Sequence, residues 1–81
     1  MSRTRVRILI RLRPEILDPE GKAVAGAIVR SGFPAPLAAR VGKMIELELA
    51  GDRPAVEPVV HQICDQLLVN AVIQEYELEW L

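Results

Sequence analysis

Cysteine, hydroxyl and aromatic side chains are all scarce in this sequence of 81 residues. The single cysteine, Cys64, cannot form a disulfide within the chain, which excludes a secreted fold held together by disulfides. Ser2, Ser31 and Thr4 are the only serines and threonine, and none lies in the setting of a catalytic nucleophile. No apolar run approaches the ~20 residues that a membrane helix needs. We therefore expect one soluble domain, residues 1–81, in the cytoplasm.

The chain has almost no excess of charge of either sign, since its formal net charge is −1. The charges are nevertheless separated along the chain. Residues 1–43 carry nine Lys and Arg against three acids, a net charge of +6, whereas residues 44–81 carry one Arg against eight acids, a net charge of −7. A nucleic-acid-binding domain needs a basic excess. RNA-binding folds of this element order stack bases on aromatic side chains of the sheet, but the first and third predicted strands of this chain have none. We expect neither a nucleic-acid nor a membrane partner.

The hydrophobic pattern predicts an α+β domain with the element order βαββαβ. Residues 5–13 alternate apolar and charged side chains, which indicates a half-buried strand, and a first helix begins at Asp18-Pro19 and ends near Gly32. Residues 37–41 and 44–49 are predicted as two strands joined by a type II′ turn at Gly42-Lys43. They are followed by a second helix over residues 55–69 and a last strand over residues 72–80. This order fits a ferredoxin-like two-layer sandwich, an antiparallel sheet with both helices on one face.

One face of this sheet is expected to stay open and charged. It would carry a row of arginines from the first strand and rows of glutamates from the others: Arg5, Arg7, Arg11 and Arg13, with Glu46, Glu48, Glu75, Glu77 and Glu79. Opposite charges on neighbouring strands stabilise a sheet by a few tenths of a kcal/mol per pair. Leu9 lies among the arginines. Our hypothesis is that the open faces of two or more copies meet here.

Candidate chemical groups on the second helix favour a structural interpretation. Glu57, His61 and Asp65 are spaced by four residues and share a helical face, but one histidine with two carboxylates is a poor metal site. We expect a solvated face there. Cys64 shares the apolar face of the helix with Val60, so a buried structural cysteine is predicted.

The Gly42-Lys43 pair lacks the other residues of a phosphate-binding loop. Arg40 and Lys43 flank the predicted turn and are a cationic pair that suits an anionic group on a partner. No catalytic, cofactor or metal site is expected in this chain. An independent small enzyme is therefore disfavoured, because a nucleophile with an adjacent base is missing.

Three stretches of the sequence resemble motifs of the PurS family, the small subunits of phosphoribosylformylglycinamidine synthase. Residues 17–21 are similar to its LDPxG turn, residues 40–47 to VRxGKxIEL, and residues 67–76 to LLANxVIExYxxE. The sequence departs from the family at residues 34–37, where a Pro-containing segment interrupts a more regular run, and at Gln74, where an acidic residue is usual.

The resemblance implies a role in de novo purine synthesis. The complex converts formylglycinamide ribonucleotide, glutamine and ATP to formylglycinamidine ribonucleotide, glutamate, ADP and phosphate. A large synthetase subunit would hold ATP and magnesium, and a glutaminase subunit would release ammonia. This chain would be the non-catalytic third subunit, a homodimer or homotetramer that supports assembly and ammonia transfer.

The expected contacts with partners or other copies, most of them taken from the motifs, are Leu9, Arg11, Arg40, Gly42, Lys43 and Tyr76. The alternative function is a small-molecule-sensing regulatory domain of the same βαββαβ order, which also dimerises.

Overall fold

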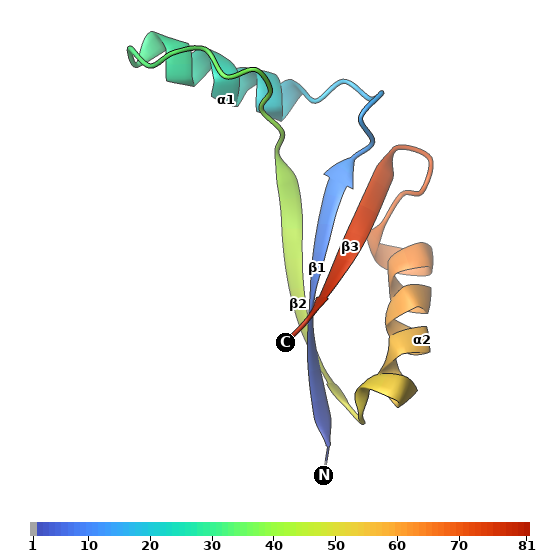
Figure 1. Cartoon of the computed structure of the whole chain (residues 1–81). Coiled ribbons are helices and arrows are strands. Elements are labelled where there is room, and N and C mark those ends of the chain that lie inside the picture. The colour runs from blue at the N-terminus through green and yellow to red at the C-terminus, as the bar shows by residue number, and fades with distance from the viewer. Residues whose placement is uncertain (1) are drawn as a thin grey trace.

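The computed structural model describes residues 2–81. These residues form three strands and two main helices (Figure 1). In order they are β1 (Arg3–Leu12), α1 (Pro19–Arg30), β2 (Gly42–Ala50), α2 (Arg53–Ile63) with a π-helical turn η1 (Cys64–Leu68), and β3 (Gln74–Trp80). The α+β class and the antiparallel sheet predicted from the sequence are confirmed.

The sheet has the strand order β2-β1-β3, and both pairings are antiparallel. Its central strand supplies half of the core, because alternate residues of β1 point toward α2. The buried apolar side chains are Val6, Ile8 and Ile10 of β1, Val56 and Val60 of α2, and Cys64 of η1. The predicted burial of Cys64 is thus confirmed. Half-buried apolar residues of β2 and β3 pack around this core.

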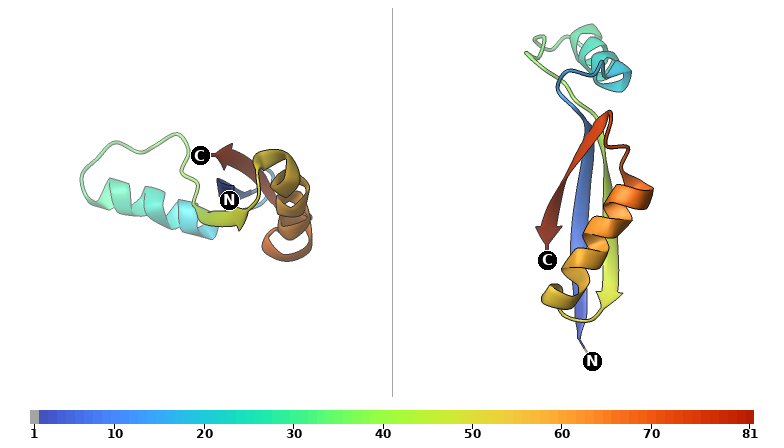
Figure 2. Two further views of the ribbon diagram at one scale, coloured as in Figure 1. Left: turned by 90° about the horizontal axis from the view of Figure 1, so that it is seen from below. Right: turned by 90° about the vertical axis from the view of Figure 1, so that its right-hand side faces the viewer.

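Helix α2 covers one face of the sheet (Figures 1 and 2). Asp52 caps its first turn by accepting a hydrogen bond from the amide of Ala55 at 3.3 Å. The guanidinium of Arg53 lies 4.8 Å from the ring centre of Trp80, which ties the beginning of α2 to the end of β3. With η1 the helical segment ends at Leu68, one residue before the predicted end. Val59 and Leu67 of this segment are exposed.

The prediction of a strand over residues 37–41 and a hairpin turn at Gly42-Lys43 is wrong. Residues 37–41 form no strand, and β2 begins at Gly42, whose backbone φ is not positive. The glycine serves a different purpose, since a Cβ at this position would lie 2.5 Å from the carbonyl oxygen of Ile10. Gly42 therefore allows β2 to approach β1 closely.

The two helices do not share one face of the sheet, contrary to the prediction. Figure 1 shows α1 beyond the end of the strands, and Figure 2 shows it projecting to the side opposite α2. Its apolar residues Val24, Ala27 and Ile28 therefore do not enter the core. We call residues 19–41, which comprise α1 and the segment that returns beside it, the arm.

The open face of the sheet carries the predicted rows of charge. Arg7 of β1 lies 3.2 Å from Glu46 of β2 and 2.8 Å from Glu79 of β3. Arg11 lies 3.5 Å from Glu75 and 2.5 Å from Glu77, while Arg3 and Arg5 pair with Glu48 and Glu46. The charge separation seen along the sequence is thus largely matched within one chain. Arg13 lies outside the rows, because β1 ends at Leu12 and the Arg13 side chain donates to the carbonyl oxygen of Ala71.

Candidate docking site

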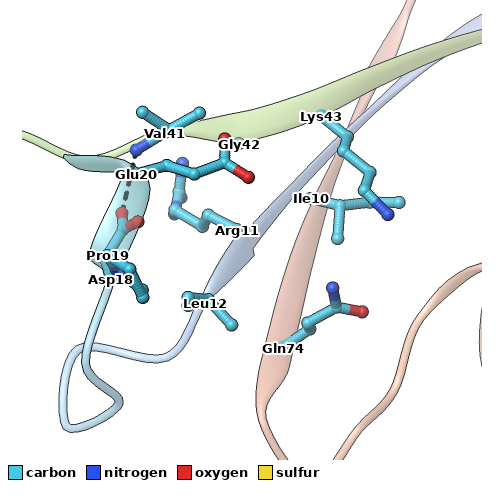
Figure 3. Close-up of a pocket in the computed structure, with 10 residues that line it drawn as sticks. All are labelled: Ile10, Arg11, Leu12, Asp18, Pro19, Glu20, Val41, Gly42, Lys43 and Gln74. Atoms are coloured by element: carbon cyan, nitrogen blue, oxygen red, sulfur yellow. Dashed lines mark hydrogen bonds between the residues drawn. The ribbon is translucent and has the colours of Figure 1, made fainter. Parts of the chain in front are cut away.

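A cleft of about 360 Å³ lies where the sheet meets the beginning of α1 (Figure 3). Ile10 and Leu12 of β1 give it an apolar wall, and Glu20 of α1 lines its rim. Figure 3 shows Lys43 of β2 and Gln74 of β3 extending toward it from opposite edges of the sheet. The cleft therefore combines apolar, cationic, anionic and amide groups, a composition suited to binding a polar surface of another protein.

Lys43 is the cation of this cleft that has no partner. In the sheet it lies opposite Ile10, on the face that α2 covers farther along. Within residues 2–81, no carboxylate lies within ion-pair distance of its ammonium group. An exposed lysine without an internal partner is available to an acidic group of another chain.

A second groove, of about 510 Å³, lies on the other side of Gly42 and borders the open face. Leu9 and Met44, which are opposite each other in the sheet, supply its apolar part. Arg11 and Arg40 also line it, but both guanidinium groups already have partners in the chain. Arg11 pairs with glutamates of β3, and Arg40 donates a hydrogen bond to the carbonyl oxygen of Leu12. Of the predicted cationic pair, only Lys43 is thus free for a partner's charge.

The fold therefore gathers five of the six predicted contact residues around one end of β2: Leu9, Arg11, Arg40, Gly42 and Lys43. The sixth, Tyr76, lies opposite Ile10 on its other side, in the same row across the sheet as Lys43. Its hydroxyl group is 2.8 Å from Nδ1 of His61, so it ties β3 to α2. Burial and the nearby charge of Asp65 raise the pKa of Tyr76 above its ordinary value. Tyr76 borders the site without lining it.

Asp18 holds this site together, and the sequence identified it only as a helix cap. One carboxylate oxygen accepts a hydrogen bond from the amide of Gly21 at 2.9 Å, and the other accepts from the amide of Val41 at 2.9 Å. These bonds fix the beginning of α1 to the beginning of β2. They also hold the pKa of Asp18 below its ordinary value, because both stabilise the ionised carboxylate. The second bond spans 23 residues, so no local pattern could have indicated it.

Gly21 of the arm contributes a close backbone contact to the same junction. It is buried, and a Cβ there would lie only 2.2 Å from the carbonyl oxygen of Ala39. The close approach of α1 to its return segment therefore requires glycine at this position. Together with Asp18, Gly21 sets the direction in which the arm leaves the sheet.

The other chemical candidates stay separate from this site. His61 is exposed, and Glu57 pairs with Arg53 at 3.5 Å. Across residues 2–81, no group of three or more His, Cys, Asp and Glu side chains is arranged to hold a metal ion. Over the same residues, no helix is long and apolar enough to cross a membrane.

The fold and the site of residues 2–81 define a small α+β domain suited to docking, with an unpartnered cation on an edge strand of its sheet and a helix held away from its core. The profile of the PurS family, described as phosphoribosylformylglycinamidine (FGAM) synthase, matches residues 5–81. The chain belongs to this family.

Individual relatives agree with the family assignment. The PurS subunit of phosphoribosylformylglycinamidine synthase from Synechocystis is 42% identical over 74 residues, which cover 90% of this chain and 74% of that one. The PurS subunit from Mycobacterium leprae is 38% identical and covers 96% and 94% of the two chains.

Solved structures share the fold. The structure of PurLQS from Thermotoga maritima contains a chain that superimposes with a TM-score of 0.90 at 29% identity, over 100% of both chains. PurS of Methanocaldococcus jannaschii, one of the subunits of formylglycinamide ribonucleotide amidotransferase in the purine biosynthetic pathway, matches with a TM-score of 0.86 at 28% identity. That match covers 96% of this chain and 95% of the other.

Proposed function

We propose that this chain is the non-catalytic assembly subunit of a cytoplasmic phosphoribosylformylglycinamidine synthase complex. In this role it associates with itself, with a large synthetase subunit and with a glutaminase subunit. It supports the transfer of ammonia between the two larger subunits, while ATP and magnesium bind to the synthetase subunit. The observation that carries the proposal is the match to a chain of a PurLQS structure over the full length of this one.

The cleft at the end of β2 suits the docking part of this role. The Lys43 ammonium pairs with no carboxylate of residues 2–81, and Lys43 lines the cleft together with the apolar wall formed by Ile10 and Leu12. An acidic side chain of a larger subunit could pair with Lys43 while neighbouring apolar atoms cover the wall. Charge complementarity of this kind mainly selects the partner and speeds association. We therefore assign Lys43 to docking.

Reconstitution tests the proposal. The chain is mixed with the purified large and glutaminase subunits of the same organism, and glutamine-dependent product formation and co-purification are measured. Both are expected to require this chain. Product formation that proceeds equally well without it would overturn the assembly role.

A charge reversal tests the cleft in the same assay. Lys43→Glu should weaken co-purification with the larger subunits by about tenfold or more, because it places like charges together. Lys22→Glu is the matched control, since Lys22 is exposed on α1 and does not line the cleft. Equal behaviour of the two variants would remove Lys43 from the docking surface.

A further inference from the structure

The chain that follows α1 is apolar, rich in proline and exposed. Residues 33–37 have the sequence Phe-Pro-Ala-Pro-Leu, and we call them the proline segment. Four of these five residues are exposed: Phe33 retains 65% of its accessible surface, and Leu37 is fully exposed. Figure 1 shows that the segment begins at the end of the arm farthest from the sheet and returns beside α1. It therefore presents apolar side chains to the surroundings of the molecule.

The two prolines hold this segment extended before any partner binds. Each proline fixes its own φ at about −65°, and the residue before a proline is restricted to extended backbone. Phe33 and Ala35 precede the two prolines. These restrictions favour the polyproline II conformation, in which about three residues complete a turn. Phe33 then shares one edge of the segment with Pro36. Pro34 shares a second edge with Leu37, so two of the three edges are apolar.

The chain is anchored on both sides of the proline segment, whereas the backbone between the anchors is free. The amide of Phe33 donates to the carbonyl oxygen of Ile28 at 3.2 Å, which closes the end of α1. The amide of Val41 donates to Asp18 at 2.9 Å. Among residues 2–81, no backbone hydrogen bond involves residues 34–40. Their carbonyl groups can therefore accept from a partner, and a segment that is already extended loses little entropy on binding.

The aromatic residues of the chain indicate which kind of partner the segment fits. Proline-rich segments in the polyproline II conformation bind in grooves lined by aromatic side chains. Outside the segment, the aromatic residues of the chain are Tyr76 and Trp80, and both pack against the core. Tyr76 is also bonded to His61, and the ring of Trp80 is covered by Arg53. A second copy of this chain therefore offers no aromatic groove, and the occupant is a different protein.

The charge beside the segment adds to the description of this partner. Residues 21–45 contain four basic residues and no acidic residue. Arg30 lies in the last turn of α1, just before the segment, and is exposed. Within residues 2–81 it forms no ion pair. An acidic group at the rim of the groove would therefore complement Arg30.

We propose that the proline segment is a second docking element, which binds in an aromatic-lined groove with an acidic rim on one of the two larger subunits. Phe33 and Leu37 are its apolar anchors, and Arg30 pairs with the rim. The proposal rests on the assembly role proposed above and adds a contact separate from the cleft at Lys43. The arm holds this contact away from the sheet, so the segment can reach a groove that the sheet does not touch.

Titration of the intact chain against the mixed larger subunits, under the conditions of the reconstitution, tests the anchors. Phe33→Ser/Leu37→Ser should weaken binding by at least about tenfold, because two apolar contacts are lost. Val59→Ser/Leu67→Ser is the matched control, since it also replaces two exposed apolar side chains, but on α2 and η1. The control should bind as the wild type does.

Two further changes test the shape and the charge of the segment separately. Pro34→Ala/Pro36→Ala retains both anchors but frees the backbone, so it should weaken binding by several-fold. Arg30→Gln should weaken binding less, and its effect should shrink at high salt. Lys22→Gln is the control for charge, because Lys22 lies in the first turns of α1, away from the segment.

A photo-crosslinking side chain introduced at Ala35 identifies the partner. We expect an adduct with one larger subunit, and the mass of the adduct shows which one. An adduct formed only with a second copy would overturn the proposal. Sedimentation velocity and far-UV circular dichroism of the isolated variants should match the wild type, and a changed oligomeric state in Phe33→Ser/Leu37→Ser would also overturn it.

The titration separates failure of this proposal from failure of the assembly role. If Phe33→Ser/Leu37→Ser binds the larger subunits as tightly as the wild type, the docking segment is refuted and the assembly role stands. An equal loss of binding in the Val59→Ser/Leu67→Ser control refutes the segment in the same way. A wild-type chain that does not bind the larger subunits refutes both.

Discussion

The guanidinium of Arg7 lies 2.8 Å from the carboxylate of Glu79, across the pairing between β1 and β3. The same guanidinium lies 3.2 Å from Glu46 of β2, so it bridges both edge strands of the sheet. Its side chain is 30% exposed, less than that of Arg3, Arg5 or Arg11. Water therefore screens these two ion pairs less than the others in the row.

Arg7→Met should lower the free energy of unfolding by about 1 kcal/mol or less, since exposed ion pairs contribute little even when they are well formed. Urea unfolding at a fixed protein concentration measures the change, and the loss should shrink at high salt. Arg5→Met is the control, because Arg5 makes only a 3.8 Å pair and is 60% exposed. Equal losses in both variants would contradict a special position for Arg7.

Replacing each of two glycines of α1 by alanine should change the stability of the helix in opposite directions. Gly21→Ala places a Cβ 2.2 Å from the backbone of Ala39 and should destabilise the arm by about 1–3 kcal/mol. Gly26→Ala meets only the flexible end of Arg30, at 3.1 Å, and should stabilise α1 by up to about 1 kcal/mol through helix propensity. Hydrogen exchange of the α1 amides measures both. Faster exchange in Gly26→Ala would refute the argument.

The hydrogen bonds of Asp18 make the junction of arm and sheet sensitive to acid. The folded-state pKa of Asp18 lies below the ordinary value of 3.8, so the ionised carboxylate contributes stability above that pH. This contribution is lost as the pH falls through the folded-state pKa. Hydrogen exchange at the Val41 amide, corrected for intrinsic rates, should therefore show less protection as the solution becomes more acidic.

Asp18→Asn supplies the control for this pH dependence. Asparagine can still cap the helix at Gly21, but its amide nitrogen cannot accept the second hydrogen bond from Val41. We expect protection of Val41 to be low in this variant and independent of pH over the same range. Protection that still falls with acid in Asp18→Asn would assign the effect to another carboxyl group.

Cys64 should react slowly with thiol reagents. It is fully buried, and burial raises the pKa of its thiol above the ordinary value of 9.0. The reactive thiolate is therefore scarce at neutral pH and shielded by α2 and the sheet. Absorbance with a chromogenic disulfide reagent should rise slowly in native protein and rapidly in urea. Fast reaction under native conditions would show that η1 opens readily.

Local patterns predicted the elements whose residues interact along the chain or across neighbouring strands. Strict alternation identified β1 and β3, and the charge rows they carry form as expected because period-two alternation places every second side chain on one face. Asp18 and Pro19 identified the beginning of α1 for a similar reason, since capping involves residues within one turn. The family motifs indicated correctly which family the chain belongs to.

The placement of α1 could not be predicted in this way. The βαββαβ order suggested a helix on the sheet, and Gly42-Lys43 suggested a turn. The structure shows instead a long return segment over residues 31–41 and a close approach of Gly42 to β1. A glycine permits either a turn or a close contact, and only its surroundings decide between the two.

The sequence alone thus determined the class of fold, the rows of charge on the open face and the family, because each is recorded in residue spacing along the chain. Only the tertiary structure decided where the arm points and which cation remains free. Those features depend on the bond from Asp18 to Val41, on the contact of Gly21 with Ala39 and on Arg40 donating to Leu12. Each joins residues 18 to 28 positions apart, a separation at which residue spacing carries no information about contact.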